Sequence, residues 1–256
     1  MLKKRIIFVL LYCDEYFIQS RNFQIQKVGD INWLKRNYDI KNISRYIDEL
    51  VVLDISRYHK NESKFLKTLQ DLSRDFLTPI SAGGGINTFS KASNLLSGGA
   101  DKVIMNTSIF DNRKLLYEVS ENYGEQSIIA SFDFKKVENN YFPFIENGKK
   151  KIDINANQIN EIFENLPVGE FLINSIDKDG TGMGLDFDLL KIFEKSKKPI
   201  ILLGGCGNAD HFEKGLDEKK INAIATANLF NFIGDGLEKS RIQLLSKNYE
   251  LPKWTS

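Results

Sequence analysis

The sequence predicts an α/β protein with a single (β/α)8 TIM barrel, and three observations lead to this prediction. Short apolar runs alternate with helical patterns along the whole of the 256 residues. Glycine-rich turns at Gly83-Gly84-Gly85 and Gly204-Gly205 follow two of these runs. Gly84 and Gly205 are 205 − 84 = 121 residues apart, close to half the chain. This spacing favours a closed barrel of two similar half-barrels over a doubly wound sheet.

The same offset relates other parts of the two halves. Glu49 opens one apolar run and Glu170 opens another (170 − 49 = 121). Asp101 precedes a third run and Asn222 a fourth (222 − 101 = 121). A repeat of this length matches half a domain and is much longer than the repeat of a solenoid. We therefore expect residues 1–256 to form one barrel domain, with four strand–helix units in each half.

The first half should contain four strands, because it has four continuous apolar runs suited to burial on both faces. They are expected at 5–11, 49–54, 78–82 and 102–106. Amphipathic patterns predict helices at 31–47, 65–72, 89–96 and 113–123. A long loop at 12–30 separates the first strand from the first helix, and loops of this length in compact domains are commonly functional.

The second half repeats this arrangement. Its strands are expected at 127–132, 170–175, 199–203 and 223–227, and its helices at 155–164, 186–196, 209–216 and 237–246. The segment 134–154 differs from a simple loop. The aromatic-rich run Tyr141-Phe142-Pro143-Phe144-Ile145 is followed by a Glu146-Asn147-Gly148-Lys149 turn, so we expect a small β-hairpin there.

Composition and charge exclude several classes of function. A net charge of +1 argues against nucleic acid or an anionic membrane as the main partner. Cys13 and Cys206 are too few for a disulfide framework, and we expect no metal and no cofactor. His59 and His211 are single histidines and are expected at the surface. The apolar run after the charged N-terminal residues is too short to span a membrane, so a cytoplasmic protein is expected.

Candidate functional residues lie where the predicted strands end, because chemistry in this fold takes place at the carboxyl ends of the strands. Asp133 follows the fifth strand and is a candidate catalytic acid or base, although capping of a turn would also account for it. Glycine-rich turns leave backbone N–H groups open to phosphate. The candidate phosphate-binding residues are Gly83, Gly84, Gly85, Asn106, Thr107, Asp179, Gly180, Thr181, Gly204, Gly205, Ala227 and Asn228.

Two phosphate sites on opposite sides of the mouth would fit a phosphorylated small molecule with a phosphate at each end. The half-chain repeat suggests that odd-numbered loops serve one anion and even-numbered loops the other. A simpler interpretation gives the glycines no ligand and leaves them as residues that allow tight turns between strands and helices.

Four charged residues stand at or near the starts of predicted strands: Arg5, Glu49, Lys102 and Glu170. Two positive and two negative side chains could meet as a ring across the bottom of the barrel. Buried charges are costly unless they are paired, so such a ring would need a functional reason. The alternative is four strand ends exposed to solvent.

The half-chain symmetry also exposes a gap in the mouth. Aligning the first strand with the fifth places Leu11 opposite Asp133. A symmetric site would carry two facing carboxylates that work as a general acid–base pair. Leucine can neither donate nor accept a proton.

With these residues, the chain resembles the HisF-type cyclase subunit of imidazole glycerol phosphate synthase, from Arg5-Ile6-Ile7 through Leu229-Phe230. The motifs that carry the resemblance are Asp48 to Ile55, Gly83 to Ile86, Gly99 to Val103, Asn106-Thr107 and Ser175 to Thr181. The resemblance implies a barrel that docks a HisH-like glutaminase against its bottom face as a heterodimer. It also implies that ammonia passes a charged gate, matched here by Arg5, Glu49, Lys102 and Glu170, with Asp101 on the glutaminase-facing surface.

The catalytic face departs from this family. The family's aspartate at the end of the first strand corresponds to Leu11, and its lysine in the first loop corresponds to Gln19. This pattern, with Lys27-Val28-Gly29-Asp30, is similar to a divergent branch associated with glycosyl amidation in surface-polysaccharide gene clusters. That likeness implies a barrel that conducts ammonia while a separate sugar amidotransferase forms acetamidino groups on a nucleotide-linked sugar.

Three functions remain open from the sequence. The first is ammonia conduction for sugar amidation, motivated by a complete gate beside a missing carboxylate. The second is the cyclase itself, a lyase of histidine biosynthesis, with another group in place of the missing acid. The third is a non-catalytic barrel that binds phosphosugars without passing ammonia. Whether the chain is itself an enzyme depends on this choice.

Overall fold

A computed structural model describes residues 3–57, 61–154, 156–232 and 234–252. Eight parallel strands form a closed barrel, because β10 pairs with both β11 and β7 and so joins the two ends of the strand order. These strands are β1 (Arg5–Cys13), β4 (Glu49–Asp54), β5 (Ile80–Gly83), β6 (Lys102–Met105), β7 (Ile128–Val137), β10 (Glu170–Ser175), β11 (Ile200–Leu203) and β12 (Ile221–Thr226). The predicted (β/α)8 barrel is confirmed.

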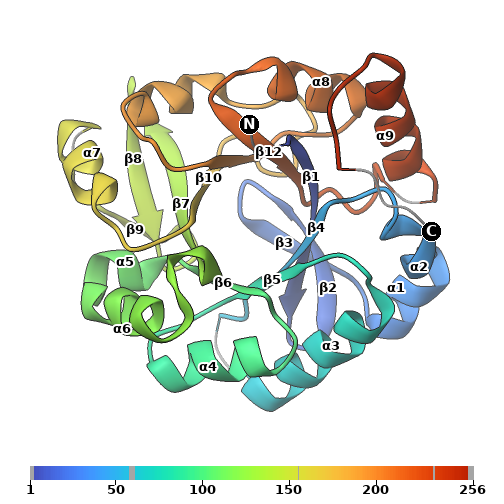
Figure 1. Cartoon of the computed structure of the whole chain (residues 1–256), viewed down its shortest axis with the longest axis horizontal. Helices are drawn as coiled ribbons and strands as arrows, with labels where there is room; N and C mark the ends of the chain where they lie inside the picture. Colours follow the sequence, from blue (N-terminus) through green and yellow to red (C-terminus); the bar gives the residue numbers. More distant parts are fainter. Residues whose placement is uncertain (1–2, 58–60, 155, 233, 253–256) are drawn as a thin grey trace.

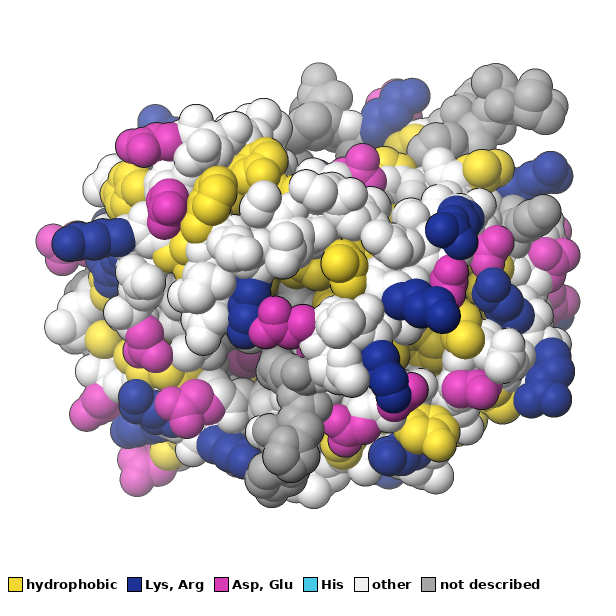
Figure 2. Space-filling model, turned by 90° about the horizontal axis from the view of Figure 1, so that it is seen from below, with side chains coloured by type: hydrophobic (Ala, Val, Ile, Leu, Met, Phe, Trp, Pro, Cys, Tyr) yellow, Lys and Arg dark blue, Asp and Glu magenta, His cyan; other side chains and the backbone are white. Residues whose placement is uncertain are grey.

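Helices surround the barrel, as the view down its axis shows (Figure 1). They are α1 (Ile31–Asn37), α2 (Ile40–Ile43), α3 (Glu62–Asp75), α4 (Phe89–Ser97), α5 (Thr107–Asp111), α6 (Arg113–Tyr123), α7 (Ala156–Glu164), α8 (Ala209–Asp217) and α9 (Gly236–Ser246), with 3₁₀ helices η1 (Glu125–Ser127) and η2 (Phe187–Phe193). The largest apolar cluster fills the space between these helices and the outer side of the strands. On the face seen in Figure 2, basic and acidic side chains are intermixed.

Two of the predicted helices have a different form. The segment 31–47 is divided, because buried Tyr38 takes an extended conformation and Asp39 begins α2 by accepting a hydrogen bond from Asn42 N–H. The segment 186–196 contains the 3₁₀ helix η2 instead of an α-helix. The carboxylate of Asp186 accepts hydrogen bonds from Tyr141 and Ser175 and therefore does not cap that helix.

The long loop expected at 12–30 is largely ordered as an antiparallel hairpin of β2 (Tyr16–Arg21) and β3 (Gln24–Gly29), which continues from β1. The expected long loop is therefore replaced by strands. Phe17 and Ile18 are buried on opposite faces of β2, Phe17 in the cluster under the helices and Ile18 in the cluster inside the barrel. The second hairpin, expected within 134–154, is confirmed as the end of β7 with β8 (Asn140–Ile145), followed by the short β9 (Lys150–Lys151).

The two half-barrels repeat small structural details. Asp101 accepts a hydrogen bond from Ile80 N–H in the first half, and Asn222 accepts one from Ile200 N–H in the second. Gly84 and Gly205 both have positive φ, at 125° and 89°. A Cβ at either position would lie about 2 Å from a backbone oxygen, so each turn requires glycine. The sequence repeat therefore reflects repeated backbone geometry.

Candidate functional site

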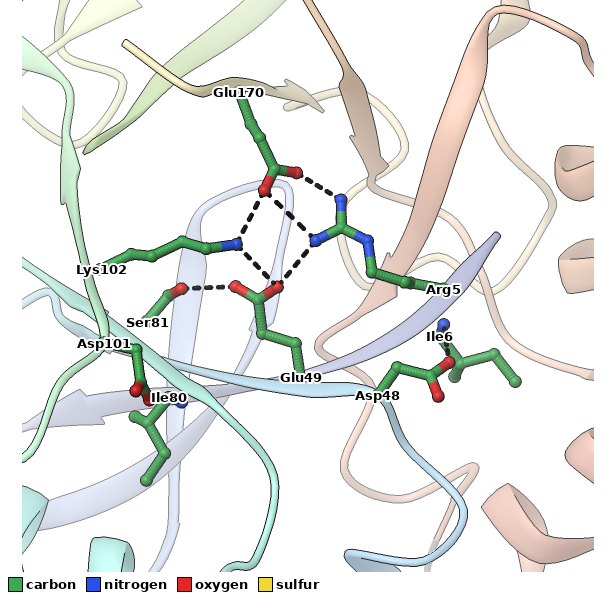
Figure 3. A network of polar contacts seen from close by, with 9 residues as sticks. All are labelled: Arg5, Ile6, Asp48, Glu49, Ile80, Ser81, Asp101, Lys102 and Glu170. Carbon is green, nitrogen blue, oxygen red and sulfur yellow. Dashed lines mark hydrogen bonds and ion pairs between the residues drawn. The ribbon is translucent and has the colours of Figure 1, made fainter. Parts of the chain in front are cut away.

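The four charged residues at the strand starts form a ring at the N-terminal end of the barrel (Figure 3). Arg5 Nη1 lies 3.0 Å from Glu49 Oε2, and Lys102 Nζ lies 3.3 Å from the same oxygen. Lys102 Nζ also lies 2.7 Å from Glu170 Oε1, and Arg5 Nη2 contacts Glu170 Oε2. Each acid thus contacts both bases. The interpretation as four solvated strand ends fails, because Glu49 is only 3% exposed.

The ring holds its charges in place. Burial would raise the pKa of Glu170, but the hydrogen bond and charge of Arg5, together with Lys102, outweigh it and hold that pKa below its usual range. Ser81 adds a hydrogen bond to Glu49 from the neighbouring strand. Asp101 lies exposed beside the ring, where its Oδ2 accepts a hydrogen bond from Ile80 N–H at 2.8 Å (Figure 3). Its carboxylate therefore already has a structural role at this end.

An apolar layer fills the barrel above the ring. Because side chains alternate along a strand, every second residue of the barrel strands points inward. The inward residues form a cluster of their own, separate from the core under the helices; its buried members in the barrel include Ile7, Val9, Val51, Ile104, Ile129, Leu172, Ile201, Ala223 and Ala225. At these positions, apolar side chains therefore separate the ring from the mouth of the barrel.

The mouth contains a cavity of about 160 Å³ at the carboxyl ends of the strands. Its wall includes three carboxylates, those of Asp54, Asp133 and Asp179, and one basic side chain, Arg57. It also includes Leu11, which is 9% exposed. The structure thus puts Leu11 and Asp133 in the wall of the same cavity, where the half-chain symmetry would place a second acid.

Asp133 is held at the cavity wall by two neutral amides. Asn106 Nδ2 donates to its Oδ2 at 2.8 Å and Asn174 Nδ2 to its Oδ1 at 2.9 Å. Burial raises the pKa of Asp133 to about 6; the two amide hydrogen bonds oppose the shift and the charge of Asp179 adds to it. A carboxyl group with such a pKa can exchange a proton near neutral pH, as a general acid or base must. Both hydrogen bonds come from side chains and not from the backbone N–H groups of a turn, so they do not support a capping role for Asp133.

The β2–β3 hairpin lies across this end of the barrel and is fastened by Asp179. Ser20 Oγ donates to Asp179 Oδ2 at 2.5 Å, and Phe23 N–H donates to the same oxygen at 3.0 Å. Gly180 allows this approach, because a Cβ there would lie 1.8 Å from Ser20 O. Asp179 and Gly180 were predicted to bind phosphate. In the structure, both residues hold the hairpin in position.

Gln19 stands where the resembling family has a lysine, and its amide is turned away from the cavity. Its Oε1 accepts a hydrogen bond from Leu229 N–H at 2.9 Å and its Nε2 donates to Ser20 O at 3.1 Å. Gln19 therefore ties the hairpin to the segment after β12. Arg57 supplies the basic group in the cavity wall instead, from the segment after β4.

The predicted phosphate-binding residues fall into two groups of neighbouring loops. Gly84, Gly85, Asn106 and Thr107, after β5 and β6, line the cavity in the mouth, whereas Gly83 lies within β5. A second, small pocket of about 10 Å³ is lined by residues after β10, β11 and β12, including Asp179, Gly180, Gly204, Gly205, Ala227 and Asn228. The expected division into odd and even loops was wrong, because adjacent strands of a barrel bring adjacent loops together.

The second group of loops is closed in this structure. A volume of about 10 Å³ is close to the minimum for a single water molecule, so a phosphate would require the loops to separate. Thr181 does not line this pocket, and its hydroxyl donates to Lys178 O at 2.8 Å. Cys206 is buried there, and burial raises the pKa of its thiol. The geometry thus favours the first group of loops for a bound phosphate.

The sequence did not single out Asn174 and Arg57. Among the residues that the structure describes, both carry a buried side-chain atom without a hydrogen-bond partner, Asn174 Oδ1 and Arg57 Nε. Both also line the cavity. A polar residue near the end of a buried strand was the available signal for Asn174. Arg57 gave no signal, because a single arginine in a loop is usually solvated.

Other expectations are limited to the described part of the chain. His59 lies outside it, whereas His211 accepts a hydrogen bond from Gly207 N–H at 3.1 Å. In residues 3–57, 61–154, 156–232 and 234–252, no group of three or more His, Cys, Asp or Glu side chains is arranged to hold a metal ion. None of the helices described there is both long and apolar enough to cross a membrane.

Comparison with known proteins agrees with this arrangement. A family model described as histidine biosynthesis protein matches residues 26–233, most of the chain. The chain belongs to this histidine biosynthesis protein family. The HisF subunit of imidazole glycerol phosphate synthase from Chlorobium limicola is 32% identical over 234 residues, covering 91% of this chain and 92% of the relative. HisF of Sulfurisphaera tokodaii is 34% identical over 241 residues, covering 93% of each.

A protein of Parasynechococcus marenigrum has a higher identity. It is 47% identical over 244 residues, covering 95% of this chain and 91% of the relative. Its name is imidazole glycerol phosphate synthase subunit hisF2, an assignment that the name itself marks as provisional. The chain is thus a HisF-like synthase subunit. The family description refers to histidine biosynthesis, and none of these names refers to polysaccharides.

Proposed function

We propose that this chain is the ammonia-using subunit of a two-component glutamine amidotransferase, paired with a HisH-like glutaminase in a heterodimer. One observation carries the proposal: a complete ring of paired charges lies at one end of the barrel, and a proton-exchanging carboxylate lies at the other. A ring of four charges is costly to bury, and binding of a phosphosugar at the opposite end of the barrel would not require it.

The layer between the two ends supports the passage of ammonia. Ammonium would lose its hydration among the apolar side chains inside the barrel, whereas uncharged ammonia crosses such surroundings at much lower cost. The ring is a candidate gate, since moving Lys102 away from Glu49 and Glu170 would open the axis of the barrel. The exposed Asp101 beside it is a candidate contact for the glutaminase.

If the barrel itself uses the ammonia, the acceptor is a phosphorylated small molecule bound in the mouth. Gly84, Gly85, Asn106 and Thr107 line the cavity that contains Asp133, so a phosphate held there would place the rest of the substrate beside that carboxylate. Gly204, Gly205, Ala227 and Asn228 would hold a second phosphate if their loops separate on binding.

The first candidate reaction is the cyclase reaction of histidine biosynthesis, which the names of the relatives favour. It requires a second acid in place of Leu11. Asp54 and Asp179 line the same cavity and are the two candidates. Each already accepts hydrogen bonds: Asp54 from Ser56 N–H, and Asp179 from Ser20 and Phe23.

The second candidate is sugar amidation, which one specific observation favours. Leu11 and Gln19 remove both an acid and a base from positions where a cyclase of the resembling family would use them, while the ring is kept whole. In this case the barrel passes ammonia to a separate sugar amidotransferase and the product belongs to surface-polysaccharide synthesis.

The decisive experiment uses the complex with the glutaminase. Lys102→Met should abolish the coupling of glutamine hydrolysis to product formation while activity with added ammonium persists. Lys67→Met, at an exposed position of α3, is the matched control and should leave coupling unchanged. Ammonia transfer that is equally efficient in both variants would refute the proposal. Feeding the ribulosyl-formimino precursor with ammonium then separates the two reactions, because only a cyclase consumes it.

A further inference from the structure

The first polar layer above the apolar interior contains Asn174. Along β10 the inward positions are Glu170 in the ring, Leu172 in the apolar layer and Asn174 at the cavity. Asn174 is 6% exposed, and the pairing of β10 with β7 places it directly beside Asp133. A small molecule that rises along the barrel axis therefore meets this pair as it leaves the apolar layer.

Of the two polar atoms of the Asn174 side chain, one makes a hydrogen bond and the other does not. Nδ2 donates to Asp133 at 2.9 Å, whereas Oδ1 is buried and has no hydrogen-bond partner. Turning the amide over would not help, because Oδ1 would then face a carboxylate oxygen, acceptor against acceptor. Buried acceptors are nearly always paired, so an unpaired one at a cavity wall points to a missing donor.

We propose that Asn174 Oδ1 and the Asp133 carboxylate together bind the ammonia that enters the mouth. Ammonia carries three N–H donors and one lone pair. It can donate one hydrogen bond to Asn174 Oδ1 and another to Asp133, and its lone pair then remains free for the substrate. The proposal rests on the ammonia supply proposed above and adds the site at which ammonia binds.

This arrangement leads to a balanced step. The nitrogen lone pair forms a C–N bond to a carbonyl carbon of the bound substrate, as the π electron pair of that carbonyl moves to its oxygen. The Asp133 carboxylate takes one proton from the nitrogen and passes it to the oxygen. The products are a neutral carbinolamine and the regenerated carboxylate. Asn174 orients the nitrogen and exchanges no proton.

Asn106 provides a matched control within the same site. Its Nδ2 also donates to Asp133, at 2.8 Å. Among the described residues, its oxygen is not one of the buried acceptors that lack a partner. Asn106→Leu and Asn174→Leu therefore each remove one amide hydrogen bond from Asp133, but only Asn174→Leu removes the unpaired acceptor.

The test uses the full chain alone, labelled with ¹³C at aspartate side-chain carboxyl carbons, with the Asp133 signal assigned from an Asp133→Asn variant. Ammonium chloride is added near neutral pH and at alkaline pH, where more of it is free ammonia, and sodium chloride serves as the salt control. The Asp133 signal should shift with the concentration of free ammonia in the native chain and in Asn106→Leu. In Asn174→Leu the response should be lost or weakened at least about tenfold in apparent affinity.

Two results would overturn the proposal: a response that follows total ammonium or salt, or an equal response in Asn174→Leu. If Asn174→Leu fails to fold, the isosteric pair Asn174→Thr and Asn174→Val replaces it, and only the threonine variant should respond. No acceptor or glutaminase is needed here. Ammonia binding without glutaminase coupling would therefore count against the proposed function alone, and coupling without binding would count against this inference alone.

Discussion

Charged side chains lie at both ends of the barrel, but their surroundings shift carboxylate pKa values in opposite directions at the two ends. At the ring, two acids and two bases neutralise one another, and the pKa of Glu170 is held low. At the mouth, Asp133 is held by two neutral amides, and its pKa is raised to about 6. The difference is what is expected if one end stays charged and the carboxyl group at the other exchanges a proton near neutral pH.

The largest effect that would test this comparison is expected from Asp133→Asn. Loss of the carboxylate held by both Asn106 and Asn174 should lower ammonia-dependent turnover by about 10²–10⁴-fold, the usual contribution of a general acid or base. Stimulation of the glutaminase should remain, because the ring lies at the other end. Steady-state rates with ammonium and with glutamine measure the two effects. A variant that retains full turnover would remove Asp133 from the chemistry.

A gain of function addresses the missing acid. Leu11→Asp combined with Gln19→Lys should raise cyclase turnover with free ammonium by about tenfold to a hundredfold, because a second carboxylate restores an acid–base pair. The substitutions also replace a mostly buried leucine of the cavity wall by a charged residue and break the Gln19 bond to Leu229, so folding is checked by urea denaturation. If the native chain already turns over well, Leu11 is tolerated and the cyclase of histidine biosynthesis is the function.

The ring should respond to Glu170→Gln through stability as well as coupling. Removing one partner of a fully buried ion pair costs about 3–5 kcal/mol. Arg5 and Lys102 are 21% and 20% exposed, so solvent screening lowers the expected loss to about 2 kcal/mol. Urea denaturation measures it, with Glu213→Gln, beside the more exposed Lys247, as the comparison. Equal losses in the two variants would mean that the ring is an ordinary set of surface pairs.

The smallest effect is the dependence on pH. If Asp133 acts as a base, turnover should rise with pH through about 6 and fall about tenfold per unit below it. The sign for stability is opposite. Its folded pKa lies above the unfolded value of about 3.9, so the stabilisation linked to its protonation is complete below about pH 4 and is lost as pH rises through 6. A flat rate profile between pH 5 and 7 would assign the proton transfer to another group.

The sequence by itself determined the barrel and its two halves, and it pointed to the four residues of the ring. Continuous apolar runs specify buried parallel strands, and the 121-residue offset from Gly84 to Gly205 reflects backbone turns that only glycine allows. The ring was predictable because strand starts of a closed barrel must converge on one end. Asp133 was visible for the same reason at the other end.

The tertiary structure decided what sequence patterns could not express. The order in the first loop depends on Asp179, which lies more than 150 residues away and holds Ser20 and Phe23. The division of the phosphate loops follows from which strands are neighbours, and the closed second pocket follows from how those loops pack. The unpaired oxygen of Asn174 arises only when β10 pairs with β7 and its amide turns toward Asp133. Each of these depends on contacts between distant segments, and local sequence carries no record of them.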